Sequence, residues 1–263
     1  MTPTPSLFRS LQIQLRVIGA LLMREVLTRY GRHNIGFLWL FLEPMLFTLG
    51  VTALWTATKS THGVQLPIVA FAVTGYSTVL VWRNSANRCC TAITPNLALM
   101  YHRNVRVLDI FLARVALEIA GATISFIALC AVFIAAGWMD LPHDFLGLAA
   151  SWALIAWFAL GLSLVIGAIS ERSEMVERLW HTTAYLLFPI SGAVFMVDWL
   201  PARAQELVLL IPMVHGAEMV RGSYFGPSVK AHYDIGYLVA WCLSLTLLGL
   251  ALVRETGRRV IPE

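Results

Sequence analysis

Long apolar stretches constrain the fold of this chain more than any other feature of its sequence. A helix needs about 20 mostly apolar residues to cross a bilayer. Six stretches are long enough and poor enough in charge to do so, at about 34–58, 66–83, 108–138, 145–170, 179–198 and 235–254. Because lipid offers no partner to backbone N–H and C=O groups, the spanning segments must be helical. We therefore expect an all-α membrane protein with six spans.

The scarcity of charge supports this interpretation. The sequence is 58% hydrophobic and only 13% charged, whereas soluble domains carry about 25% charged residues. Such a chain has too few charges to cover a globular surface. We expect residues 1–32 to form a cytoplasmic N-terminal segment, 33–256 the transmembrane domain and 257–263 a cytoplasmic tail.

Basic residues predict how the chain is oriented. Fifteen of the 19 Lys and Arg residues lie on one side, in residues 1–32, 83–114, 172–178 and 254–263, which take in the ends of the adjoining spans. The other side holds four, Lys59, Arg203, Arg221 and Lys230. Cytoplasmic connections carry an excess of Lys and Arg, so both termini are expected in the cytoplasm.

Two further segments are predicted to lie in the membrane without crossing it. In residues 6–30, apolar residues recur every three or four positions, which indicates an amphipathic interface helix. On periodicity alone, this helix either anchors the chain or docks a partner. The apolar stretch 207–217 would extend about 16 Å as a helix, too short to cross. We expect a re-entrant or interfacial helical element at about 203–226.

The sequence lacks the common catalytic patterns. Neither Lys59 nor Lys230 follows a glycine, so no phosphate-binding loop is expected. The four cysteines lack zinc-ligand spacing, and no metal site is expected. Ser191–Gly192, with His181 and His215 as nominal partners, would suit an intramembrane enzyme, but the glycine two residues before the serine is missing. A small pair in a membrane helix more often marks close packing.

Two blocks of sequence carry a family resemblance. Residues 29–45, RYGRHNIGFLWLFLEPM, and residues 82–114, WRNSANRCCTAITPNLALMYHRNVRVLDIFLAR, resemble membrane subunits of type-2 ABC polysaccharide exporters. The resemblance is strongest to capsular-polysaccharide exporters of Gram-negative bacteria. It extends from the interface helix to the last span. The two blocks are less specific in distinguishing capsule exporters from exporters of O-antigen or teichoic acid.

The resemblance implies a permease subunit, not an enzyme, in the bacterial inner membrane. Its cargo would be a lipid-linked polysaccharide. A homodimer would bind separate ATP-binding subunits that carry ATP and Mg, so this chain needs no cofactor. A periplasmic co-polymerase and an outer-membrane export protein would continue the path, and nucleic acid has no part in it. A permease for a small molecule, or an intramembrane enzyme, is the alternative.

The family also has a cytoplasmic coupling helix between spans two and three. The matching residues here are about 93–104, where Pro95 suits the first turn of a helix. An ordinary membrane-surface helix is the alternative. The candidate coupling residues are Pro95, Asn96, Leu99, Met100, Tyr101 and Arg103.

Glu43 and Pro44 interrupt the first span and suggest a conduit. A carboxylate is costly in lipid, so Glu43 should face a hydrated path or form a structural hydrogen bond. Aromatic rings can stack on sugars, and guanidinium groups pair well with a phosphate of the lipid linker. Packing against lipid and anchoring at the cytoplasmic surface are the alternatives. The candidate path residues are Trp39, Glu43, Phe47, Tyr76, Trp82, Arg83, Arg88, Tyr185 and Phe188.

Overall fold

The computed structural model describes residues 7–30, 42, 45, 46, 48–50, 52–54, 56, 66–101 and 105–260. The main helices are α1 (Leu7–Tyr30), α3 (Ile68–Cys90), α4 (Leu97–Met100), α5 (Val107–Ala135), α6 (Phe145–Ser170), α7 (Glu174–Ile190), α8 (Ala202–Val208), α9 (Pro212–Phe225) and α10 (Ile235–Val260). Short 3-10 turns occupy Thr94–Asn96, Val197–Trp199 and Gly226–Ser228. No strand occurs in the described residues, which confirms the all-α prediction.

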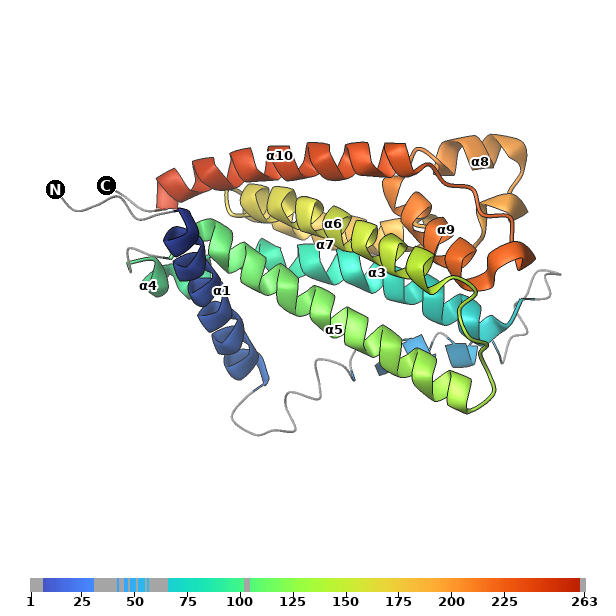
Figure 1. The fold of residues 1–263 in the computed structure, drawn as a ribbon. Coiled ribbons are helices and arrows are strands. Elements are labelled where there is room, and N and C mark those ends of the chain that lie inside the picture. The colour runs from blue at the N-terminus through green and yellow to red at the C-terminus, as the bar shows by residue number, and fades with distance from the viewer. Residues whose placement is uncertain are drawn as a thin grey trace.

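The long helices form a bundle with different structures at its two ends (Figure 1). Helices α3, α5, α6, α7 and α10 run along the bundle, and α6 packs against α3 and α10. Helix α1 crosses one end steeply and packs against α5, with α4 nearby. Helices α8 and α9 cover the opposite end. We call these the α1 end and the α9 end.

Three of the described helices, α5, α6 and α10, are long and apolar enough to cross a membrane. Helix α3 carries Arg83 and Arg88 in its second half, and α7 has only 17 residues. The first predicted span lies largely outside the described residues, so the count of six spans stays a prediction. Helix α7 also begins and ends earlier than the predicted fifth span at 179–198. Glu174 and Glu177 favour its first turn through the helix dipole, and Gly192 has a positive φ of 81° just beyond its end.

Glycines let α6 and α10 approach closely. A Cβ at Gly249 would lie 2.6 Å from Cβ of Leu164, and one at Gly161 would lie 2.9 Å from Cβ of Leu245. Any side chain at these positions would therefore push the two helices apart. Small residues are the usual means of close helix packing in membranes.

A buried charged cluster holds the α9 end together. Arg221 of α9 is fully buried, lies 3.7 Å from the ring centre of Phe71, and donates to the carbonyls of Gly192, Ala193 and Phe195. Glu218, also fully buried, accepts N–H bonds from Val197 at 3.1 Å and His232 at 2.9 Å. A helix of 14 residues extends about 21 Å, short of the bilayer core. Its re-entrant placement in the membrane stays a prediction.

Candidate functional site

Four of the candidate path residues meet between α3 and α7. Nη2 of Arg83 donates to the hydroxyl of Tyr76 at 3.3 Å. The guanidinium carbon lies 5.8 Å from the ring centre of Tyr76 and 5.6 Å from that of Tyr185. The rings of Tyr76 and Phe188 meet edge to face, with centres 5.6 Å apart. We call Tyr76, Arg83, Tyr185 and Phe188 the Arg–Tyr cluster.

The Arg–Tyr cluster opens onto the surface of the subunit. Tyr76 is only 5% exposed and belongs to the packed interior. Arg83 and Phe188 are half-buried, whereas Tyr185 is 68% exposed. The cluster thus presents a guanidinium beside an open aromatic ring. Such a surface offers a charge-assisted donor for an anion and a flat apolar face for a sugar ring.

The other candidate path residues lie elsewhere. Trp82 is 2% exposed and packs in the core that α3 forms with α6. Arg88 lies near the end of α3, where its Nε is 3.6 Å from Oε1 of Glu118. Neither side chain joins the Arg–Tyr cluster. Trp39, Glu43 and Phe47 lie outside the described residues.

The predicted coupling segment lies at the α1 end and has two faces. Pro95 lies in the 3-10 turn Thr94–Asn96 that leads into α4, at a first-turn position that suits proline. Asn96 and Met100 are buried, whereas Tyr101 is 92% exposed. Leu99 is half-buried. The side chain of Tyr101 is therefore available to a partner, whereas those of Asn96 and Met100 face inward. Arg103 lies outside the described residues.

Polar contacts join this segment to α1. Nη1 of Arg24 donates to Oδ1 of Asn96, and Nη2 lies 3.5 Å from the carbonyl oxygen of Pro95. Nδ2 of Asn96 in turn donates to the carbonyl of Ala92 at 2.8 Å. We call Arg24, Asn96 and the carbonyl of Pro95 the α1 junction. It joins α1 and the predicted coupling segment into one connected unit.

A second set of contacts adds α5 to this unit. Nε of Arg114 lies 3.2 Å from Oε1 of Glu25. Nη1 of Arg114 donates to the carbonyls of Arg88 at 2.7 Å and Thr91 at 3.0 Å. Sequence reasoning did not assign Arg24, Glu25 or Arg114. One signal was available, because Glu25 is the only acidic residue in the amphipathic segment 6–30.

A polar cleft of about 490 Å³ lies beside the coupling segment, between the end of α3 and the turn from α6 to α7. Thr94, Glu171 and Glu177 are among its lining residues. Burial, together with the nearby Glu177, raises the pKa of the Glu171 carboxyl above its ordinary value. Within the described part of the chain, neither Glu171 nor Glu177 has a cationic partner. The cleft is also lined by Arg172, which pairs with Glu255, and by Arg178, which pairs with Glu174, so Glu171 and Glu177 are the carboxyl groups that a basic group would meet there.

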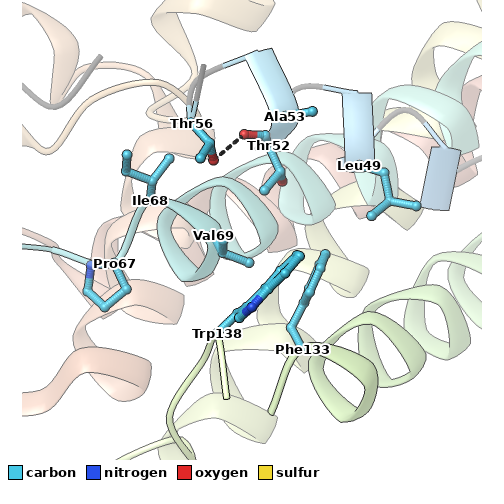
Figure 2. Close-up of a pocket in the computed structure, with 9 residues that line it drawn as sticks. All are labelled: Leu49, Thr52, Ala53, Thr56, Pro67, Ile68, Val69, Phe133 and Trp138. Carbon is cyan, nitrogen blue, oxygen red and sulfur yellow. Dashed lines mark hydrogen bonds between the residues drawn. The ribbon is translucent and has the colours of Figure 1, made fainter. Parts of the chain in front are cut away.

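A second pocket is lined mainly by apolar side chains (Figure 2). It has a volume of about 680 Å³ and lies between the start of α3, the end of α5 with the turn after it, and the side chains of Leu49, Thr52, Ala53 and Thr56. Phe133 and Trp138 stack in its wall, with ring centres 5.8 Å apart. The hydroxyl of Thr56 donates to the carbonyl of Thr52 at 2.7 Å, so it is already engaged. This pocket suits hydrocarbon better than sugar.

Ser191 and His215 do not form a catalytic pair. The hydroxyl of Ser191 donates to the carbonyl of Phe188 at 2.7 Å. Nε2 of His215 bonds the carbonyl of Leu209 at 2.8 Å, and its Nδ1 accepts the N–H of Asp234 at 2.9 Å. Each side chain therefore has a structural role at the α9 end. Among the described residues there is no group of His, Cys, Asp or Glu that could hold a metal ion.

Comparisons with known proteins point to one family. Residues 16–225 match the family described as ABC-2 type transporter. The chain is 49% identical over 258 residues to the capsule polysaccharide export inner-membrane protein CtrC of Neisseria meningitidis serogroup B, a match that covers 98% of this chain and 97% of that protein. It is 47% identical over 255 residues to the capsule polysaccharide export inner-membrane protein BexB of Haemophilus influenzae, covering 97% and 96%. The polysialic acid transport protein KpsM of Escherichia coli is 25% identical over 250 residues, covering 92% and 94%.

Proposed function

This chain belongs to the ABC-2 type transporter family, and we propose that it is the permease subunit of an exporter that moves a capsular polysaccharide across the bacterial inner membrane. The observation that carries the proposal is its identity of 49% and 47%, over nearly the whole chain, with two capsule polysaccharide export inner-membrane proteins. We further infer that the polymer is lipid-linked and that two copies enclose the path.

The Arg–Tyr cluster is the part of this path that the geometry supports best. Its exposed ring and half-buried guanidinium lie on a face of α3 and α7 that is open in the single subunit. A second copy facing this surface would enclose it. Dimers with closed symmetry present the same surface twice, so the path would carry two such clusters.

ATP hydrolysis belongs to a separate subunit that holds ATP and Mg. We infer that this subunit docks at the α1 end, which is then cytoplasmic, as are both termini. Tyr101 supports this placement because its side chain is exposed beside a turn that packs inward. The polar cleft, where Glu171 and Glu177 lack cationic partners among the described residues, offers a second contact for a basic group. The α1 junction would then pass movement of the coupling segment to the interface helix.

The remaining partners act beyond the α9 end. We propose that a periplasmic co-polymerase meets the turns around α8 and α9, and that an outer-membrane export protein continues the path. The relatives' names do not mention these partners. Their recognition of this chain would require the α9 end to be periplasmic.

The function is tested by deleting the gene in its encapsulated host and locating the polymer. We expect capsular polysaccharide to accumulate inside the cell and to return to the surface when the wild-type chain is supplied. Normal surface capsule in the deletion strain would refute the proposal. Loss of another surface polymer with an intact capsule would instead favour the O-antigen or teichoic-acid alternative.

A further inference from the structure

We propose that Arg83, held between Tyr76 and Tyr185, binds an anionic group of the cargo, either a sugar carboxylate or a phosphate. The site would make the path selective for acidic polymers or for their anionic lipid end. This inference rests on the proposed function, because it assigns a ligand class to the same path. Four observations on α3 and α7 carry it.

The first observation is the depth of Arg83. The residue lies about 22 Å along α3 from Ile68 and about 10 Å from Cys90, at a rise of about 1.5 Å per residue. A hydrocarbon core is about 30 Å thick. If α3 enters the core near Ile68, Arg83 is still within it. An arginine at that depth is costly unless it has a partner or faces water, and such residues mark substrate pathways.

The second observation is the direction of the side chain. Arginines near helix ends usually extend toward the nearer membrane surface, which for Arg83 is the end of α3 at Cys90. Instead, its guanidinium is bonded to the hydroxyl of Tyr76, which is two helical turns nearer the α9 end. The charge is therefore directed into the span. Anchoring to headgroups at the α1 end does not explain this geometry.

The third observation is that the guanidinium has unused donors. Arginine has five N–H donors, and Arg83 has a hydrogen-bond partner at Nη2 alone within the described residues. No carboxylate in that part of the chain pairs with it. Arg88 and Arg114, by contrast, lie 3.6 Å from Glu118 and 3.2 Å from Glu25. Among the described residues Arg83 therefore has no counter-ion, and an anionic ligand would supply one.

The fourth observation is the aromatic setting. The rings of Tyr76 and Tyr185 lie 5.8 and 5.6 Å from the guanidinium carbon, within cation–π range. Rings hold the flat group in place, and its N–H edge remains available for bidentate pairing with carboxylate or phosphate. The exposed ring of Tyr185 is placed to contact the sugar that carries the charge. A guanidinium and an aromatic ring side by side bind an acidic sugar better than either group would alone.

A binding assay tests this directly. The full chain is placed in phosphatidylcholine nanodiscs, and tryptophan fluorescence follows titration with a hexasaccharide of alternating glucuronic acid and N-acetylglucosamine. Neutral maltohexaose is the comparison. We expect the acidic oligosaccharide to bind at least tenfold more tightly, and Arg83→Gln to remove that preference. Equal binding of the two oligosaccharides by the wild type, or a preference that survives Arg83→Gln, would overturn the proposal.

Matched variants separate the site from general effects of charge and folding. Arg254→Gln removes a charge from α10, where Arg254 is exposed and lacks a carboxylate partner among the described residues, and it should keep the preference. Tyr185→Leu changes an exposed side chain, so folding should be kept while both oligosaccharides bind more weakly. Loss of preference in Arg254→Gln would contradict a local site. Unchanged binding in Tyr185→Leu would remove Tyr185 from it.

A second arm identifies the source of the anion. Adding phosphatidylglycerol to the nanodiscs should leave hexasaccharide binding intact if the site takes a polymer carboxylate. It should weaken that binding, in the wild type but not in Arg83→Gln, if the site takes a lipid phosphate. Both outcomes support an anion site. Weakening to the same extent in the two proteins would refute it, because the lipid would then act elsewhere.

Export in cells separates this inference from the proposed function. If the wild-type chain restores surface polymer and an equally abundant Arg83→Gln chain does not, the inference and the proposed function both stand. If both chains restore full export at the same rate, the inference fails and the proposed function stands. If wild-type chain restores no polymer, the proposed function fails whatever the variant does.

Discussion

Replacing Arg24 with alanine should weaken the contact between the interface helix and the coupling segment. Oδ1 of Asn96 accepts from Arg24 in a setting where Asn96 is 4% exposed. Without Arg24, this oxygen loses its charged donor in a place that water reaches poorly. We expect Arg24→Ala to reduce export several-fold while ATPase association persists, because α1 would no longer follow the coupling segment.

The magnitude follows from the two bonds of Arg24. A hydrogen bond to a charged group contributes about 1.5–3 kcal/mol, and partial exposure of this one lowers the expected value to about 1–2 kcal/mol. The contact with the carbonyl of Pro95, at 3.5 Å and exposed, adds little. One kcal/mol shifts the melting temperature of a chain this size by about 2–4 °C. The variant should therefore melt about 2–8 °C lower.

The assay is a double-mutant cycle in detergent, read by size-exclusion chromatography after heating. Arg24→Ala, Asn96→Ala and the double variant are compared with the wild type. Two residues that act through one bond show a combined loss smaller than the sum of the single losses. The control is Arg16→Ala, because Arg16 is an exposed arginine on the same helix. Strictly additive losses, or normal export by Arg24→Ala, would refute the reasoning.

Three further predictions concern docking, topology and stability. Tyr101→Asp should reduce co-purification of the ATP-binding subunit at least several-fold without lowering membrane insertion, because Tyr101 is 92% exposed on the coupling segment; unchanged co-purification would exclude it from the docking surface. Cysteine at Ser228 should react with an impermeant maleimide applied outside spheroplasts, whereas cysteine at Ser173 should react only after lysis, and the reverse pattern would invert the proposed orientation. Both positions are exposed. Glu218→Leu should destabilise the chain by about 1–4 kcal/mol, because it leaves one buried and one partly buried N–H group without an acceptor; a melting temperature within 2 °C of the wild type would contradict this account.

The comparisons confirm the resemblance that residues 29–45 and 82–114 carry. They also agree with capsule export as the expected function. The long apolar helices were predictable for a local reason. Helices α5, α6 and α10 each contain an 18-residue stretch with a mean hydropathy of 2.0 to 2.2 and at most two charged residues, so each segment specifies its own helix. Other expectations, including six spans, the dimer and the periplasmic partners, stay predictions.

The candidate site was only partly predictable, and two adjacent residues show why. The sequence predicts both Trp82 and Arg83 as path residues, yet Trp82 lies in the core and Arg83 in the Arg–Tyr cluster. Neighbours on a helix point about 100° apart, so they cannot both face the same surface. Which of them turns inward depends on where α6 and α7 pack, and the sequence of α3 alone does not contain that information.

The sequence by itself determined the membrane class, the helical content and the family of this protein, because these depend on local hydropathy and on matched motifs. Only the tertiary structure decided which charged residues act together. Arg24 meets Asn96 across 72 positions, and Arg221 of α9 is buried against Gly75 of α3, where a Cβ would lie 2.2 Å from its Nη2. The partner of a charged side chain is set by which distant segments pack beside it. In a protein with so few charges, that packing also decides which charged side chains can bind a ligand or one another.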